Sequence, residues 1–224
     1  MIRVAESLEL SLRERNDLLL AAGYAPVYAE SRLDDRTLLP VQNALKRILG
    51  GYLPYPAVVV RPYGELVAAN AAIGLLIEGA ADDLLEPPVN LLRLSLHPGG
   101  LADRVVNLAQ WGRHVVESLR SQSLRSPDPR LDELITELES YIPDVNSGPD
   151  HLGCAVPRRL RTDRGELGLI TTLTSFATAT DVTVAELQLE AFLPADDASA
   201  EILRRAQRDQ KNEDPLSRAL SEWK

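Results

Sequence analysis

The sequence is poor in the residues that build disulfides and metal centres. Among its 224 residues it has one cysteine, Cys154, and three histidines. A single cysteine cannot form an intramolecular disulfide or supply a cysteine-based metal cluster. The histidines, His97, His114 and His151, follow none of the short spacings that place two imidazoles on one metal ion. We therefore expect neither a bound metal ion nor a required cofactor.

Long apolar runs and an excess of positive charge are also missing. No stretch approaches the ~20 apolar residues of a membrane-spanning helix, and the first residues lack the apolar core of a secretory signal. Lys and Arg number 24 against 33 Asp and Glu, a formal net charge of −9, whereas a nucleic-acid-binding domain usually presents a basic face. We expect a cytoplasmic chain that has no membrane partner and is not mainly a DNA-binding domain.

The residues that are plentiful are aliphatic. Hydrophobic residues make up 45 % of the chain and aromatic residues only 4 %. About one residue in six is leucine, which is well above the usual frequency of this residue. The composition predicts a globular protein of one or two domains with an aliphatic core.

Helical periodicity is found in several segments. Apolar residues at three- to four-residue spacing predict helix over residues 5–22. Within it Ser11 and Glu14 have the spacing of a capping box, so a second helix is expected to span 12–22. The same periodicity predicts the remaining helices, at 38–49, 71–77, 101–122, 130–141 and 198–210, with a short helix or buried turn at 90–96.

Shorter segments have the alternation and β-branched content of strands. Residues 56–61 and 65–69 predict one hairpin, and residues 155–161 and 166–177 a second, followed by a final strand at 183–193. These segments predict an α+β fold in which helices lie over one face of a five-stranded antiparallel sheet. Asn70 directly follows the second strand and is expected to cap the helix after it.

No group of residues has the spacing of a known catalytic site. The Gly-x-Ser-x-Gly motif of a nucleophilic serine is absent. His151 and Cys154 lie three residues apart in a predicted loop, but a lone cysteine is most often a small buried apolar residue. We predict no catalytic residue and no enzymatic activity. The alternative is a small-molecule hydrolase or transferase that uses His114 or His151 with a nearby carboxylate.

The aliphatic segments instead suggest a binding pocket. Trp111 and His114 are three residues apart on one predicted helix and therefore share a face. They either frame the mouth of an apolar pocket or are ordinary core and surface residues. Strand alternation and helix faces give the candidate ligand-binding residues, which are Val58, Val60, Leu66, Ala68, Asn70, Leu108, Trp111, His114, Val115, Leu169 and Leu173.

Two groups of segments resemble known bacterial regulators. Residues 12–26 resemble the last helix and exit of an Xre-type helix-turn-helix domain. Several segments resemble the ligand-binding domain of MmyB-like transcription regulators, in the order 56–60, 66–72, 90–98, 107–111, 131–138 and 181–187. The resemblance extends over residues 3–205, and the order and spacing of the segments make it specific.

The resemblance implies a PAS-like sheet that binds a small apolar ligand, with a fatty acid as the leading class. Asn70 matches the asparagine that follows the second strand in the family. The resemblance divides the chain into a helix-turn-helix remnant at 1–26, a linker and helix at 27–55, a ligand-binding domain at 56–197, and a helix with a frayed tail at 198–224.

The expected function is ligand sensing by a transcription regulator that forms a homodimer. The family's recognition helix would precede the segments matched here, so DNA contact is expected only through N-terminal helices of a full-length form. The alternative, from another class, is a dimerisation or interaction module that binds no ligand.

Overall fold

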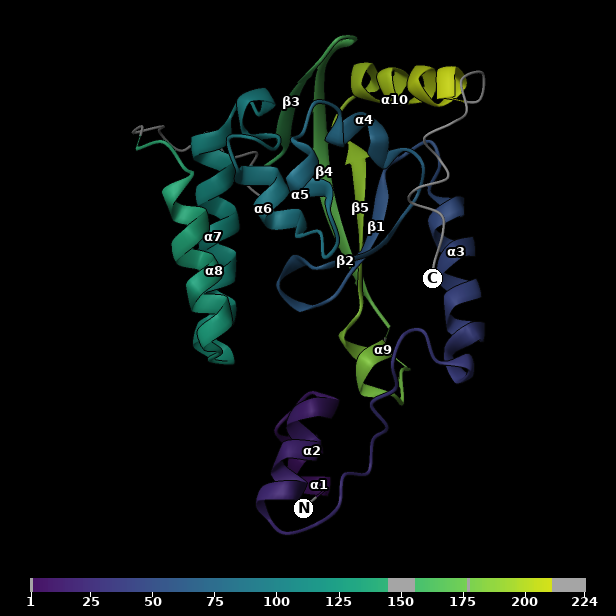
Figure 1. Cartoon of the computed structure of the whole chain (residues 1–224), viewed down its shortest axis with the longest axis vertical. Helices are drawn as coiled ribbons and strands as arrows, with labels where there is room; N and C mark the ends of the chain where they lie inside the picture. Colours follow the sequence, from purple (N-terminus) through teal and green to yellow (C-terminus); the bar gives the residue numbers. More distant parts are fainter. Residues whose placement is uncertain (1, 145–155, 177, 211–224) are drawn as a thin grey trace.

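A single five-stranded antiparallel sheet forms the centre of the protein. The computed structural model describes residues 2–144, 156–176 and 178–210. Its strands are β1 (Ala57–Val60), β2 (Leu66–Ala69), β3 (Arg158–Thr162), β4 (Gly165–Ser175) and β5 (Gln188–Pro194). They pair in the order β2-β1-β5-β4-β3, and every pairing is antiparallel. The expected α+β fold with five antiparallel strands is confirmed, and the last strand in sequence occupies the middle of the sheet (Figure 1).

Helices surround this sheet and extend beyond one end of it (Figure 1). They are α1 (Ile2–Ser7), α2 (Leu12–Ala21), α3 (Leu39–Gly51), α4 (Ile73–Ile77), α5 (Asp82–Leu85), α6 (Leu91–Leu96), α7 (Leu108–Arg125), α8 (Pro129–Ser140), α9 (Val182–Glu186) and α10 (Asp197–Gln210). The predicted capping box opens α2, because Ser11 Oγ accepts from the Glu14 backbone N–H and the Glu14 carboxylate accepts from the Ser11 backbone N–H. No helix in the described parts of the chain has the length and apolar character needed to cross a bilayer.

Both faces of the sheet are buried. We call one the arginine face; its strand residues are Val58, Val60, Arg158, Leu160, Leu167, Leu169 and Phe192, and it packs against α4, α6 and α10. The opposite one, the α3 face, consists of Ala57, Val59, Leu189 and Ala191 and packs against Leu45 and Leu49 of α3. The expectation that helices cover only one face was therefore wrong. Because strands buried on both sides need apolar residues at every position, β1 is a continuous apolar run.

Two segments differ from the sequence prediction for local reasons. The predicted strand at 183–193 begins only at Gln188, because Asp181 accepts from the Thr183 and Val184 backbone N–H groups and caps the short helix α9. The predicted helix at 101–122 begins only at Leu108. Before it, the Val106 backbone N–H donates to the Arg159 carbonyl over 2.8 Å, which holds this stretch beside β3.

Asn70 has a different role from the predicted helix cap. Helix α4 begins after Ala72 without a side-chain cap. The buried Asn70 amide instead donates to the carbonyls of Leu49 and Tyr55 and accepts from the Ala57 backbone N–H. It joins the end of α3 to the start of β1, so its hydrogen bonds are satisfied by the backbone.

Candidate functional site

A buried arginine is the main polar group on the arginine face. Arg158 opens β3 and is only 2 % exposed, although it is charged. Its position follows from the alternation of side chains along a strand. Leu160 is fully buried two residues on, so Arg158 points inward with it, while Arg159 and Arg161 are exposed. The alternation of side chains along β3 therefore places the guanidinium of Arg158 in an aliphatic core.

Three other elements contribute side chains around this guanidinium. Arg158 Nη1 donates to the hydroxyl of Ser95, on α6, over 3.3 Å. The Cζ atom lies 5.3 Å from the ring centroid of Trp111, on α7, and 5.1 Å from that of Phe192, on β5. Both distances are within the range of cation–π attraction. Helices α6 and α7 and strands β3 and β5 thus converge on one cation.

Most of the hydrogen-bonding capacity of Arg158 is unused. Among the described residues, neither Nε nor Nη2 has a hydrogen-bond partner. Arg104 shows the usual arrangement for comparison, since its guanidinium donates to the backbone carbonyls of Leu75, Leu76, Glu78 and Arg161. Buried polar groups without partners are uncommon in folded proteins and call for a specific explanation.

The electrostatic surroundings of Arg158 compensate its charge only partly. Burial lowers its pKa to about 10, and the positive charge of Arg104 acts in the same direction. The carboxylate of Glu190, on β5, opposes this shift. Burial in turn raises the pKa of Glu190, against the effect of Arg158. With a pKa near 10 the guanidinium is cationic at neutral pH, so the core contains a positive charge that forms no direct ion pair with any described residue.

Six of the predicted ligand-binding residues gather around this cluster. Val58, Val60 and Leu169 are buried on the arginine face, and Leu66, Leu108 and Trp111 are partly buried against them. The others lie elsewhere. Ala68 belongs to the α3 face, Asn70 bonds the backbone, and Val115 packs toward α8. His114 is exposed, whereas Trp111 is partly buried, and Leu173 is 63 % exposed near the end of β4.

The sequence interpretation missed Arg158, Ser95, Phe192 and Glu190. A usable signal for Arg158 was present in the predicted strand at 155–161. If Leu160 faces the core, strict alternation puts Arg158 on the same side. The register of β5 brings Glu190 opposite Val58, and Phe192 opposite Thr171. The pairing of β1 with β5 joins residues more than a hundred apart in sequence, and local patterns contain no information about it.

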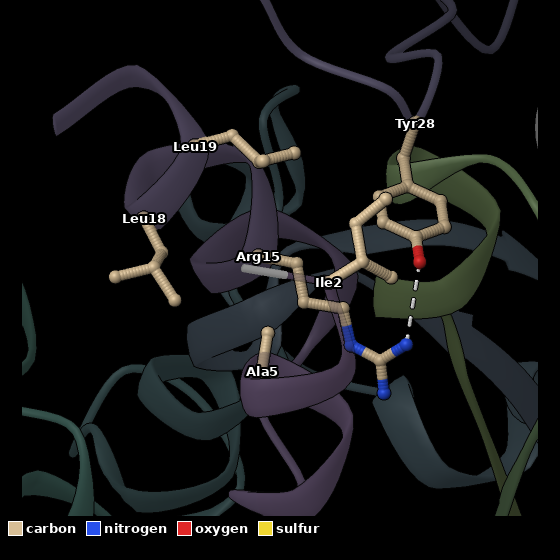
Figure 2. A pocket seen from close by; sticks show the side chains of 6 residues that line it. All are labelled: Ile2, Ala5, Arg15, Leu18, Leu19 and Tyr28. Carbon is tan, nitrogen blue, oxygen red and sulfur yellow. Dashed lines mark hydrogen bonds between the residues drawn. The ribbon is translucent and has the colours of Figure 1, made fainter. Parts of the chain in front are cut away.

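Two hollows lie away from this cluster, around the N-terminal helices. The first lies between α1, α2 and Tyr28 and is lined by Ile2, Ala5, Arg15, Leu18, Leu19 and Tyr28 (Figure 2). Arg15 Nη1 reaches the Tyr28 hydroxyl over 3.4 Å beside it. Its interior has essentially no room for a water-sized sphere, so it is a shallow packing gap and not a ligand site.

The second hollow is an open groove between α2 and α9. It holds about 220 Å³ and is lined by residues that include Leu12, Arg13, Phe176, Val182 and Glu186. This volume is also below the usual range for a drug-sized ligand. The groove marks the junction between the N-terminal helices and the sheet domain, and we do not assign it to a ligand.

The described residues contain no cluster of three or more His, Cys, Asp or Glu side chains that could hold a metal ion. His97 is used locally, since its Nδ1 accepts from the Gly99 backbone N–H over 3.0 Å. His151 and Cys154, which were considered as a nucleophile–base pair, lie outside the described residues.

An apolar sheet face that surrounds a few convergent polar groups is the usual organisation of a small-molecule-binding domain. Comparison with known families gives the same class. Residues 41–206 match the MmyB-like transcription regulator ligand binding domain, which is more than half of the chain, and the protein belongs to this family. The match begins within α3, includes all five strands and Arg158, and leaves out α1 and α2. No curated protein gives a significant match.

Proposed function

We propose that this chain is the sensory part of a bacterial Xre-type helix-turn-helix regulator, and that it binds a small apolar ligand such as a fatty acid. The observation that carries the proposal is the family match over residues 41–206. A regulatory domain of this kind needs no catalytic residue, and we propose that the chain is not an enzyme. As part of a transcription regulator it would act in the cytoplasm.

The arginine face is the proposed ligand site. Its apolar surface is supplied by strands and by helices that pack across it, so a ligand between the two layers would meet aliphatic side chains on both sides. The predicted residues that line this region are Val58, Val60, Leu66, Leu108, Trp111 and Leu169. Burial of an alkyl chain contributes about 0.8 kcal/mol for each CH₂ group, which makes such a site selective for length and shape.

We propose that the effect of ligand binding is transmitted through α9 to the N-terminal helices. Arg13, on α2, binds the Glu186 carboxylate of α9 through Nε at 2.5 Å and Nη2 at 2.9 Å, and it also reaches Glu30. Helix α9 leads through Leu187 into β5, the strand that carries Phe192 and Glu190. A ligand that shifts β5 would therefore move a helix attached to α2. Such a switch requires the ligand to favour one of two arrangements over the other.

The proposed DNA contact and homodimer also involve this end of the molecule. Residues 12–26 resemble the end of a helix-turn-helix domain, so DNA binding is assigned to that module and not to the sheet. Helices α1 and α2 and the turn between them expose apolar side chains, among them Val4 at 53 %, Leu8 at 62 % and Leu20 at 55 %. Exposed apolar patches of this kind are typical of surfaces that pack against other helices.

Organic extraction of the purified chain, followed by mass spectrometry, tests the proposed ligand. We expect a lipid in an amount close to one per chain, and added dodecanoate or 1-dodecanol should bind to lipid-free protein. A parallel extraction of an unrelated protein from the same host measures the background. If the extract is empty and neither probe binds, the ligand proposal is wrong and the interaction module becomes the better interpretation.

A gel-shift titration with a full-length regulator of this family tests whether ligand binding changes DNA binding. The form used should contain this chain joined to a complete helix-turn-helix domain. We expect binding to a specific DNA site that changes when the ligand is added. Absence of sequence-specific binding at low salt, where phosphate contacts are strongest, would contradict the regulator assignment.

A further inference from the structure

We infer that a free strand edge of β4, at residues 170–175, binds the same edge of a second copy of this chain. The inference rests on the proposed homodimer and names its contact, and the exposed side chains of α1 and α2 remain available to the helix-turn-helix module. β4 pairs with β5 over residues 169–175, but β3 pairs with it only as far as Leu169 (Figure 1). We call residues 170–175 the open edge.

The backbone groups of the open edge alternate in direction. The Gly168 carbonyl accepts from the Ala195 backbone N–H over 2.9 Å, so the even-numbered residues of β4 point their backbone groups toward β5. The N–H and C=O groups of Thr171, Leu173 and Ser175 therefore point away from β5, and no described residue forms a hydrogen bond with them. They form a row of donors and acceptors that an added strand can pair with.

The other edges of the sheet are covered or short. Along β3, the Val106 backbone N–H donates to the Arg159 carbonyl over 2.8 Å. The outer strand β2 has only four residues, and the Leu66 backbone N–H at its start donates to the Val89 carbonyl over 2.8 Å. Covering segments and short strands are usual protections of a sheet edge. The open edge is therefore the exception within this sheet.

The side chains of the open edge also lack the features that discourage pairing. Its sequence, Ile-Thr-Thr-Leu-Thr-Ser, contains no charge and no proline, and its pairing with β5 continues without a bulge. Threonine and isoleucine favour strands. Leu173 is 63 % exposed and is the one large apolar side chain that is exposed in the described strands. An added strand would cover it.

A second copy suits the open edge because the edge is complementary to itself. An antiparallel pair centred on Leu173 places the two Leu173 residues opposite each other, and Thr171 of each copy opposite Ser175 of the other. Each outward N–H group then meets a carbonyl of the other copy. Directly opposite side chains lie on the same face, so the two leucines would cover each other. A two-fold contact of this kind closes with two copies.

The distribution of charge also favours contact between two copies at this edge. The chain has a net charge of −9, so two copies repel each other over most of their surfaces. Residues 167–180 contain no Asp, Glu, Lys or Arg, although a quarter of the whole chain is charged. Like charges directly opposite each other destabilise a sheet. Two acidic copies can pair through the open edge without placing such charges together.

The first test is analytical ultracentrifugation of the unaltered chain and of Leu173→Lys over a range of concentrations. Because Leu173 is exposed, we expect the variant to fold, with a melting temperature within about 2 °C of the unaltered chain. Two lysines would face each other in the pair, so the dissociation constant of the dimer should rise at least about tenfold. Leu124→Lys is the matched control, because Leu124 is 86 % exposed on α7 and the same change there should not affect the dimer.

The outcomes separate the inference from the proposed function. An unchanged dissociation constant in Leu173→Lys, or an equal rise in the control, would overturn the inference and leave a homodimer through another surface. A chain that stays monomeric at every concentration would overturn both the open edge and the proposed homodimer. Neither result bears on ligand binding, which the organic extraction tests separately.

The second test exchanges charges between two variants. Leu173→Glu alone should dimerise as poorly as Leu173→Lys, because each places like charges opposite each other. An equimolar mixture should form a heterodimer at least about tenfold more tightly than either variant pairs with itself, since Lys then faces Glu. Absence of this recovery would contradict a two-fold pair centred on Leu173. It would indicate that a strand of another protein covers the edge.

Hydrogen exchange of the unaltered chain tests the same contact without a substitution. The amides of Thr171, Leu173 and Ser175 should exchange at least about tenfold more slowly above the dissociation constant of the dimer than below it. The amides of Thr172 and Thr174 point toward β5 and serve as the internal control, since they should change much less. Equal exchange of the three outward amides at both concentrations would overturn the inference.

Discussion

Arg158 gives up its hydration on folding and, within the part of the chain that the structure describes, recovers one hydrogen bond, to Ser95. Burial of a charge without full pairing is costly, and replacement of such a group by an apolar one of similar volume is often stabilising. The cation–π contacts with Trp111 and Phe192 offset part of this cost.

Arg158→Met is therefore expected to stabilise the ligand-free protein. Methionine fills much of the same space and adapts to irregular packing, so we expect the free energy of unfolding to rise by about 1–4 kcal/mol. Urea denaturation of lipid-free protein measures this change. A loss of stability would mean that the contacts of Arg158 with Ser95 and the two rings hold the core together.

A second residue, Tyr63, stabilises a strained turn between β1 and β2. Its φ angle of 65° lies in the left-handed region, which a residue with a side chain rarely adopts. The Tyr63 hydroxyl donates to Asp128 over 2.7 Å, at the start of α8. Burial, and next the bond to Asp128, raise the pKa of Tyr63 to about 12. The pKa of Asp128 is lowered, mainly by Arg130 and then by Tyr63.

These shifts predict how stability depends on pH. Because the Tyr63 pKa is higher in the folded state, its contribution is fully present below pH 10 and is lost as the pH rises toward 12. Asp128 contributes above its unfolded pKa of 3.8, and this contribution is lost as the pH falls below that value. The urea midpoint of the unaltered chain should therefore exceed that of Tyr63→Phe by a constant amount from pH 6 to 9. A difference that does not shrink above pH 10 would contradict the assignment.

At the scale of elements, the sequence correctly predicted the helices and turns that depend on local patterns. The capping box of α2, the hairpin of β1 and β2, and the helices α3, α8 and α10 follow from residues close in sequence. The missed features depend on distant partners. Residues 101–107 have a helical pattern, but β3 supplies hydrogen-bond partners that hold them outside the helix. The alternation of β3 places Arg158 on the same side as Leu160, but the pairing of β3 with β4 decides that this side faces the core.

Two sequence features compete at α9, namely the side chain of Asp181, which caps a helix, and an alternation of apolar residues that favours a strand. Leu187, Leu189 and Ala191 alternate with other residues as in a strand, whereas Val184 is out of phase with them. Asp181 decides the outcome, because its carboxylate caps α9 and also accepts from the Ser31 backbone N–H over 3.1 Å. That second bond joins the N-terminal connector to the sheet domain over 150 residues of sequence.

The Arg13–Glu186 pair is expected to contribute a measurable coupling between α2 and α9. The two side chains are 44 % and 24 % exposed, so solvent screening reduces the energy of the ion pair. A double-mutant cycle with Arg13→Gln and Glu186→Gln should give about 0.5–1 kcal/mol at low salt and less at high salt. The Arg32–Asp34 pair, exposed by 86 % and 58 %, is the control and should give no measurable coupling. Equal coupling energies for both pairs would contradict the proposed role of Arg13 in transmitting ligand binding to α2.

At the scale of the whole molecule, ligand binding should appear as thermal stability. A ligand that binds only the folded state adds about 2.7 kcal/mol when present at a hundred times its dissociation constant. For a domain of this size each kcal/mol raises the melting temperature by roughly 2–4 °C. Dodecanoate at that ratio should raise it by about 5–10 °C. An unchanged melting temperature at that concentration would contradict a lipid site on the arginine face.

The position of β5 in the sheet also sets an order of events during synthesis. Strands β1 and β2 form one hairpin and β3 and β4 another, and β5 joins them from the middle although it is the last strand to leave the ribosome. Until residues 188–194 emerge, β1 and β4 each have an unpaired edge, and such edges promote association with other chains. The nascent protein therefore depends on rapid synthesis of the segment that follows β4, and a pause in translation before β5 would favour aggregation.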